Sequence, residues 1–172
     1  MTDYDDYLMK SYHLRDQLVG DKFRPKYHFI PPEGQWNDIN GAIYWNGRYH
    51  LGYLQKISNG PNQLDFSSWQ HISSRDLLHW TYHKAYLSEP LEGSKGDYFN
   101  SGDAMEGMET PTIITNMPRK GICIYQCHDD NLEHWEPLAE NPVISIEDGR
   151  NHSSKTLRPK AKFPDCVIFD PS

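Results

Sequence analysis

One carboxylate, Asp38, lies among side chains that suit the binding and cleavage of a sugar. The segment around it, QWNDINGAIYW, carries Trp36 and two asparagines, Asn37 and Asn40. Amides can hydrogen-bond sugar hydroxyls, an indole can cover the apolar face of a sugar ring, and a carboxylate can attack an anomeric carbon. Amide hydrogen bonds from the two asparagines would keep this carboxylate ionised. The alternative is an Asx-turn in an Asn-Asp-x-Asn-Gly loop.

A tight β-hairpin is predicted directly after this carboxylate. The segment AIYWNGRYHLGYLQ alternates around Asn46-Gly47, a dipeptide that favours the two-residue type I′ turn. The two hairpin strands are predicted over 41–45 and 48–54. Asp38 would therefore lie at the start of the first strand.

The rest of the chain is rich in short strands separated by Gly, Pro and Asn. Further strands are predicted over 69–74, 80–84, 112–115, 121–127 and 167–169. Residues 1–22 have apolar residues loosely spaced at helical intervals. These patterns divide the chain into an N-terminal helical segment, 1–25, and an all-β domain, 26–172.

Two segments, 71–90 and 126–144, resemble each other. Each runs from a strand through a turn containing Asp to Leu-x-His-Trp, ending at Trp80 or Trp135. A recurrence of this length favours β-propeller blades over a β-sandwich. The alternative for each Leu-x-His-Trp motif is a packed hairpin in which the tryptophan fills the core and has no catalytic role. Since propellers close with about four to eight blades, and about three fit here, we expect a truncated part of a larger protein.

Composition and charge exclude several classes of function. Lys plus Arg number 17 against 24 Asp plus Glu, a net charge of −7, which argues against a nucleic-acid binder. No run approaches the roughly 20 apolar residues of a membrane span, and the N-terminus has no apolar signal-peptide region. A cytoplasmic protein is therefore expected. The three cysteines and nine histidines show no metal-ligand spacing, so neither a metal nor another cofactor is expected.

Four ordered motifs make the chain resemble the family 32 glycoside hydrolases, which include invertases, inulinases, levanases and fructosyltransferases. QWNDINGAIYWNGRYHLGYLQ is similar to that family's nucleophile motif, Trp-Met-Asn-Asp-Pro-Asn-Gly, with its hairpin. WQHISSRDLLHW (69–80) is similar to Trp-Gly-His-Ala-x-Ser-Arg-Asp-Leu-x-x-Trp. NSGDA (100–104) resembles Phe-Ser-Gly-Ser-Ala, and FDPS (169–172) stands where the family carries Arg-Asp-Pro. The resemblance implies a five-bladed propeller, of which this chain supplies roughly the first two to three blades after a short N-terminal helix.

The resemblance also implies an activity and a set of site residues. Family members hydrolyse or transfer β-fructofuranosyl groups with retention, which requires a carboxylate nucleophile and a general acid. Asp38 would be the nucleophile, and Asp170 would stabilise the transition state by accepting hydrogen bonds from sugar hydroxyls. The implied substrate is a fructoside, sucrose or a fructan, and the implied substrate-binding residues are Trp36, Asn37, Gln55, Trp69, Asn100, Ser101 and Phe169.

The chain departs from the family pattern near Asp38. Ile39 replaces proline, which would make the turn after the carboxylate less rigid, and Asn100 and Asp103 replace Phe and Ser. These changes bear on substrate preference more than on fold.

Two family groups are altered or missing. Phe169 stands in place of an arginine and cannot make its forked contacts, which leaves Arg158 and Lys160 as candidates and an Asp-Pro turn as the alternative. The family's acid/base glutamate would follow the last residue of this chain, and nothing assigns its role to Glu106 or Glu109. We therefore expect little or no activity from the isolated chain.

Three functions remain open from the sequence. The first is a fructosidase or fructosyltransferase, and the second is a non-catalytic, carbohydrate-binding propeller fragment. The third, a five-bladed enzyme acting on arabinose-containing furanosides, is disfavoured by WQHISSRDLLHW. The sequence indicates neither the linkage cleaved nor the oligomeric state.

Overall fold

The computed structural model describes residues 13–14, 16–25, 28–31, 35–57, 66–88, 99–106, 110–118 and 120–147. These residues form antiparallel β-sheets, which confirms the all-β prediction. The helix predicted over 1–22 is not confirmed, because most of that segment lies outside the described residues and the element defined there is a 3₁₀ turn, η1 (Leu18–Gly20). The strand predicted over 167–169 also lies outside them.

The first sheet contains four strands in sequence order, joined as antiparallel neighbours. They are β1 (Gln35–Trp45), β2 (Arg48–Ile57), β3 (Phe66–Ser74) and β4 (Thr81–Leu87). Asn46 and Gly47 have φ angles of 46° and 75°, and two positive values define the predicted type I′ turn. The strand before this turn is longer than predicted, so Asp38 lies within β1 rather than at its start.

The second sheet repeats this arrangement. Its strands are β5 (Gly102–Glu106), β6 (Pro111–Met117), β7 (Gly121–Cys127) and β8 (Trp135–Pro137), with β9 (Ile144–Ser145) also paired to β7. β7 has the predicted bounds, whereas β5, β8 and β9 were not predicted. Two successive antiparallel sheets, each built on four strands in sequence order, are the arrangement of neighbouring propeller blades. The total of five blades stays a prediction.

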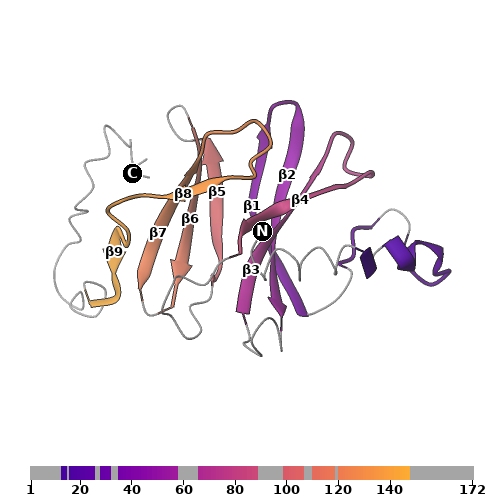
Figure 1. Ribbon diagram of the computed structural model, residues 1–172, viewed down its shortest axis with the longest axis horizontal. Helices are drawn as coiled ribbons and strands as arrows, with labels where there is room; N and C mark the ends of the chain where they lie inside the picture. The colour runs from indigo at the N-terminus through magenta and orange to yellow at the C-terminus, as the bar shows by residue number, and fades with distance from the viewer. Residues whose placement is uncertain are drawn as a thin grey trace, which may run out of the picture.

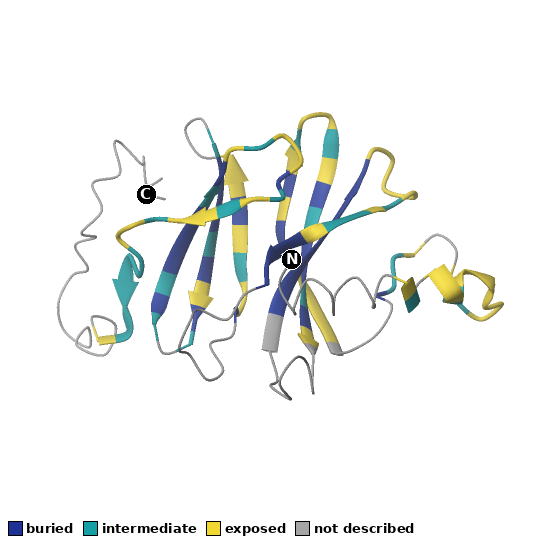
Figure 2. Ribbon diagram, viewed as in Figure 1, coloured by how far each residue is buried: buried dark blue, intermediate teal, exposed yellow. Residues whose placement is uncertain are grey.

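The two sheets lie side by side, with β1 close to β5, as Figure 1 shows. Buried positions concentrate along the middle strands of both sheets (Figure 2). The hydrophobic cluster draws on both sheets, with Trp69 and Leu87 from the first and Ile113, Met117 and Cys127 from the second. The sheets therefore share one core.

The sequence repeat corresponds to equivalent turns in the two sheets. In both turns an aspartate accepts hydrogen bonds from main-chain N–H groups that follow it, Asp76 between β3 and β4 and Asp129 between β7 and β8. The leucine of each Leu-x-His-Trp motif has a positive φ, 63° at Leu77 and 59° at Leu132. This shared geometry confirms that the two segments are structural repeats.

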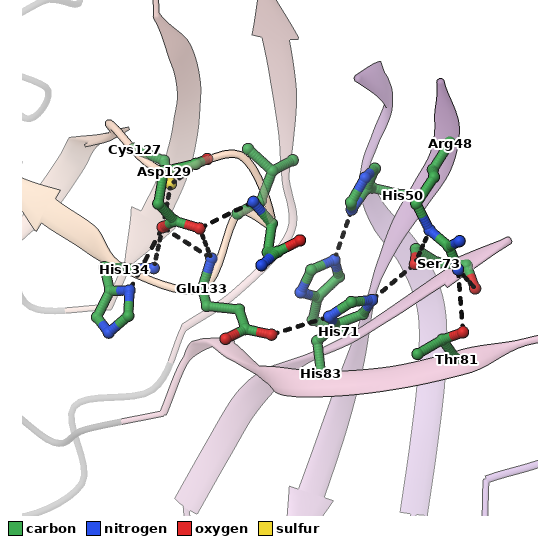
Figure 3. Close-up of polar contacts among 12 residues, drawn as sticks. Arg48, His50, His71, Ser73, Thr81, His83, Cys127, Asp129, Glu133 and His134 are labelled. Carbon is green, nitrogen blue, oxygen red and sulfur yellow. Dashed lines mark hydrogen bonds and ion pairs between the residues drawn. The ribbon is translucent and has the colours of Figure 1, made fainter. Parts of the chain in front are cut away.

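A polar layer crosses the contact between the sheets (Figure 3). His50 Nδ1 lies 2.9 Å from His71 Nε2, and the rings of His71 and His83 stack with centroids 4.3 Å apart. His83 Nδ1 lies 2.9 Å from a carboxylate oxygen of Glu133 in the second sheet. Burial first, and His83 next, lower the pKa of His50 to about 4 and the pKa of His71 well below its usual value. Both rings are therefore neutral at pH 7.

Candidate active site

Asp38 lies in a β-bulge of β1. Trp36 pairs with Gln55 and Ile39 pairs with Tyr53, so that two residues of β1 oppose a single residue of β2. Such an extra residue bends a strand and turns its side chain out of the regular alternation. Asp38 is exposed, as are Asn37 and Ile39 beside it, on a strand that packs against the second sheet. The less rigid turn expected at Ile39 is replaced by this bulged strand.

The amides beside Asp38 bond its main chain and not its carboxylate, which corrects the sequence-based expectation. Asn37 Oδ1 accepts from the N–H of Asp38 at 3.0 Å, and Asn40 Nδ2 donates to the carbonyl of Asp38 at 3.1 Å. The bulge places these short side chains beside neighbouring peptide groups. The carboxylate instead accepts a hydrogen bond from Ser101, whose Oγ lies 3.2 Å from Asp38 Oδ2.

The buried indole of Trp69 holds the segment that carries Ser101. Trp69 Nε1 donates to the carbonyl of Asn100 at 3.0 Å, and Thr115 Oγ1 donates to the same oxygen at 3.1 Å. Gly41, at a second bulge of β1, has a φ of 64°, and a Cβ there would lie 3.1 Å from the Trp69 ring. A glycine is therefore required where β1 passes over this indole.

A cavity of about 430 Å³ adjoins the carboxylate. Its volume lies in the range of small-molecule sites in proteins. Its lining combines Asp38 with aromatic, aliphatic and amide groups: Phe29, Pro31, Trp36, Asn37, Ile39, Leu51 and Tyr53. The Phe29 and Tyr53 rings contact each other with centroids 4.9 Å apart. This composition can bind a sugar ring through both its hydroxyls and its apolar face.

The remaining predicted substrate-binding residues fall into two groups. Trp36 is 61% exposed, and Asn37, Asn100 and Ser101 are also exposed, so all four can reach a ligand. Gln55 is 1% and Trp69 0% exposed, which places both beneath the surface as supports. Direct sugar contact by this second group stays a prediction.

Several predicted positions lie outside the described residues. These are Phe169 and Asp170 of the fourth motif, their neighbours Arg158 and Lys160, and Glu109. Glu106 is described, and it is exposed at the end of β5. The assignments of Asp170 and Phe169 therefore stay predictions.

Sequence reasoning missed two contributors to the site. Phe29 lines the cavity although it precedes the first strand, and the N–H of Gly102 bonds the side chain of Asn40. The aromatic-proline run YHFIPP was a possible signal for the former. No local pattern predicted the bond between Gly102 and Asn40, because these two residues lie far apart in the sequence.

Metal-ligating clusters and membrane-spanning helices are both absent from the described part of the chain. None of its clusters of His, Cys, Asp or Glu brings three or more side chains together to hold a metal ion. Among the same residues, no helix has the length and apolar character needed to span a membrane.

The sequence of the chain is similar to a family model and to several known proteins. The model of the glycosyl hydrolases family 32 N-terminal domain matches residues 28–163. The chain is 29% identical over 145 residues to a beta-fructofuranosidase, insoluble isoenzyme 2, of Oryza sativa subsp. indica, covering 78% of this chain and 24% of that protein. It is 31% identical over 134 residues to a levanase of Bacillus subtilis strain 168, covering 71% of this chain and 19% of that protein.

A solved structure shows the same fold. Beta-fructofuranosidase from Schwanniomyces occidentalis, complexed with fructosyl-erythritol, aligns with a TM-score of 0.58 at 22% identity, covering 72% of this chain and 27% of that chain. The fold thus places the chain in the β-propeller class. The chain belongs to glycosyl hydrolases family 32. It spans about a fifth to a quarter of the length of these two relatives, 19% of the levanase and 24% of the beta-fructofuranosidase.

Proposed function

We propose that this chain contributes the nucleophile of an enzyme that hydrolyses or transfers β-fructofuranosyl groups with retention of configuration. The observation that carries the proposal is the exposed Asp38 carboxylate, held by Ser101 beside a sugar-sized cavity with Trp36 in its wall. Family membership and the names of the relatives, a beta-fructofuranosidase and a levanase, support fructosides as the substrate class. In this proposal residues 26–172 belong to the catalytic propeller.

In this proposal the two carboxylate oxygens of Asp38 have different tasks. Oδ2 accepts the Ser101 hydrogen bond, which fixes the rotation of the carboxylate. Oδ1 is then the oxygen that attacks the anomeric C2 of the fructosyl group. The new C–O bond forms as the bond from C2 to the leaving group breaks, and water later hydrolyses the fructosyl ester.

Two further groups complete the proposed reaction. Asp170 would accept hydrogen bonds from sugar hydroxyls as positive charge develops on the ring. A carboxylic acid that protonates the leaving group is also required, and none of the described residues is assigned to that role. Because a general acid typically contributes about 10²–10⁴ in rate, we expect slow turnover of natural substrates by this chain.

A substrate with an activated leaving group tests the nucleophile without a general acid. With β-fructofuranosyl fluoride, Asp38 would form the ester while the C2–F bond breaks and fluoride departs unprotonated. We expect a burst of one fluoride per chain, measured with a fluoride electrode. Mass spectrometry of peptides should find one fructosyl group on Asp38.

Two controls make the result decisive. Asp38→Asn should lose both the burst and the label, whereas Asp130→Asn, at an exposed position in the turn after β7, should keep them. Fructose binding without burst or label in any variant would refute the catalytic proposal. That outcome would favour the alternative, a non-catalytic carbohydrate-binding fragment.

A further inference from the structure

One amide side chain connects the proposed nucleophile to the second sheet. Asn40 Oδ1 accepts from the N–H of Gly102 at 2.9 Å, and its Nδ2 donates to the carbonyl of Asp38 at 3.1 Å. Asn40 is 2% exposed, so its amide is oriented by the protein and not by solvent. We propose that Asn40 is a positioning residue that fixes Asp38 relative to Ser101. This inference rests on the proposed function.

The need for such a connection follows from the construction of the site. Asp38 belongs to β1, whereas Ser101 immediately precedes β5, and 63 positions separate them in the sequence. Their hydrogen bond survives only if the two strands keep a fixed offset. Asn40 connects the same two segments. It follows Asp38 by two residues, and the Gly102 that it bonds follows Ser101 by one residue.

Two irregularities in the pairing of β1 with β2 lie close to Asn40. A bulge lies on each side of it, between Trp36 and Ile39 and again between Asn40 and Ile43. The main chain of β1 therefore lacks a regular β-ladder on both sides of Asn40. A side chain that bonds the Asp38 carbonyl replaces part of this missing support.

The chemistry of an amide is also specific to the position. It presents an acceptor to one main chain and a donor to the other, which a carboxylate or a hydroxyl cannot do in the same geometry. Asn40→Asp would keep the acceptor for Gly102 and place an oxygen against the Asp38 carbonyl. Asn40→Ala would remove both bonds.

The chain offers a matched control at Asn141. Its Oδ1 accepts from the N–H of Ile124 at 2.8 Å, and its Nδ2 donates to the carbonyl of Ile124 at 2.7 Å. Asn141→Ala therefore also removes one donor bond and one acceptor bond to main chain, but on β7. A loss of stability alone would affect both alanine variants.

The experiment combines the fluoride burst with amide hydrogen exchange on the full chain. Asn40→Ala should lower the limiting burst rate at least about tenfold. The concentration of β-fructofuranosyl fluoride that gives half of the limiting rate should change less than about threefold. Exchange at the Gly102 amide should become faster in Asn40→Ala and stay slow in Asn40→Asp. Asn40→Asp should still lower the burst, because the Asp38 carbonyl loses its donor.

The outcomes separate this inference from the proposed function. A burst in the wild-type chain that is equally fast in folded Asn40→Ala would overturn the positioning role alone. An equal loss of burst in Asn141→Ala would overturn it too, by showing a general effect of stability. A wild-type chain without any burst refutes Asp38 as nucleophile, and the positioning role with it.

Discussion

Acid should destabilise this chain through the histidines between its sheets. Burial, followed by His83, lowers the pKa of His50 from 6.5 to about 4, so the unfolded chain binds a proton that the native chain excludes. Stability is then greatest above pH 6.5 and falls as the pH decreases toward 4. For this one group the free energy of unfolding should decrease by about 2 kcal/mol between pH 7.5 and pH 5, at about 1.36 kcal/mol per pKa unit. His71, whose pKa is also lowered, adds to the loss in the same direction.

Urea unfolding followed by tryptophan fluorescence at pH 7.5, 6 and 5 measures this effect. His50→Gln should be less stable than the wild type at pH 7.5, because it disturbs the bond to His71. Its free energy of unfolding should nevertheless depend less on pH, by about 2 kcal/mol across the same interval. His128→Gln is the matched control, since His128 is exposed on the loop after β7.

The chosen pH interval separates the histidines from the carboxylates. Hydrogen bonds from the main chain and side chain of His79 hold the pKa of Asp76 well below its usual 3.8. The stabilisation from Asp76 is therefore present above about pH 4 and is lost only at lower pH. Equal pH dependence in the wild type and in His50→Gln would refute the role of the buried imidazole.

Two further substitutions test the packing and the turns. Gly52→Ala should cost about 1–3 kcal/mol in urea unfolding, since a Cβ there would collide with the β1 backbone and lie 3.0 Å from the Tyr86 ring. Gly20→Ala meets no atom within 4 Å and is its control; equal midpoints for both would contradict the close approach. Asp129→Ala should also cost about 1–3 kcal/mol, because main-chain N–H groups of the β7–β8 turn lose their acceptor. Asp130→Ala, at an exposed neighbour without that role, should leave the midpoint unchanged, and a loss as large as that of Asp129→Ala would argue against the turn.

Local signals were sufficient for much of the fold. Asn46-Gly47 specifies its turn through two positive φ angles, and the apolar run of β7 specifies its strand. The repeated Asp and Leu-x-His-Trp pattern located both outer turns because each turn is built from its own residues. β8 and β9 escaped prediction since they are short and polar or half-buried, and owe their conformation to pairing with β7.

The sequence singled out Asp38 and Trp36, which line the cavity, while their role in sugar binding stays a prediction. The hydrogen-bond partners of Asn37 and Asn40 could not be predicted, because both asparagines lie at the bulges of β1. A bulge arises from the register with β2, which no stretch of β1 alone encodes. The contact between Asn40 and Gly102 depends further on how the two sheets pack.

The division of the site between two sheets has a consequence for the order of folding. The consecutive strands β1 to β4 are neighbours in the first sheet, and β5 to β8 are neighbours in the second, so both sets can assemble from short-range hairpins. The bond from Ser101 to Asp38 closes a far longer loop and requires both sheets to have associated. The surroundings of the Asp38 carboxylate would thus be completed last in a nascent chain, and a folding intermediate with both hairpin sets formed would still lack the bond from Ser101.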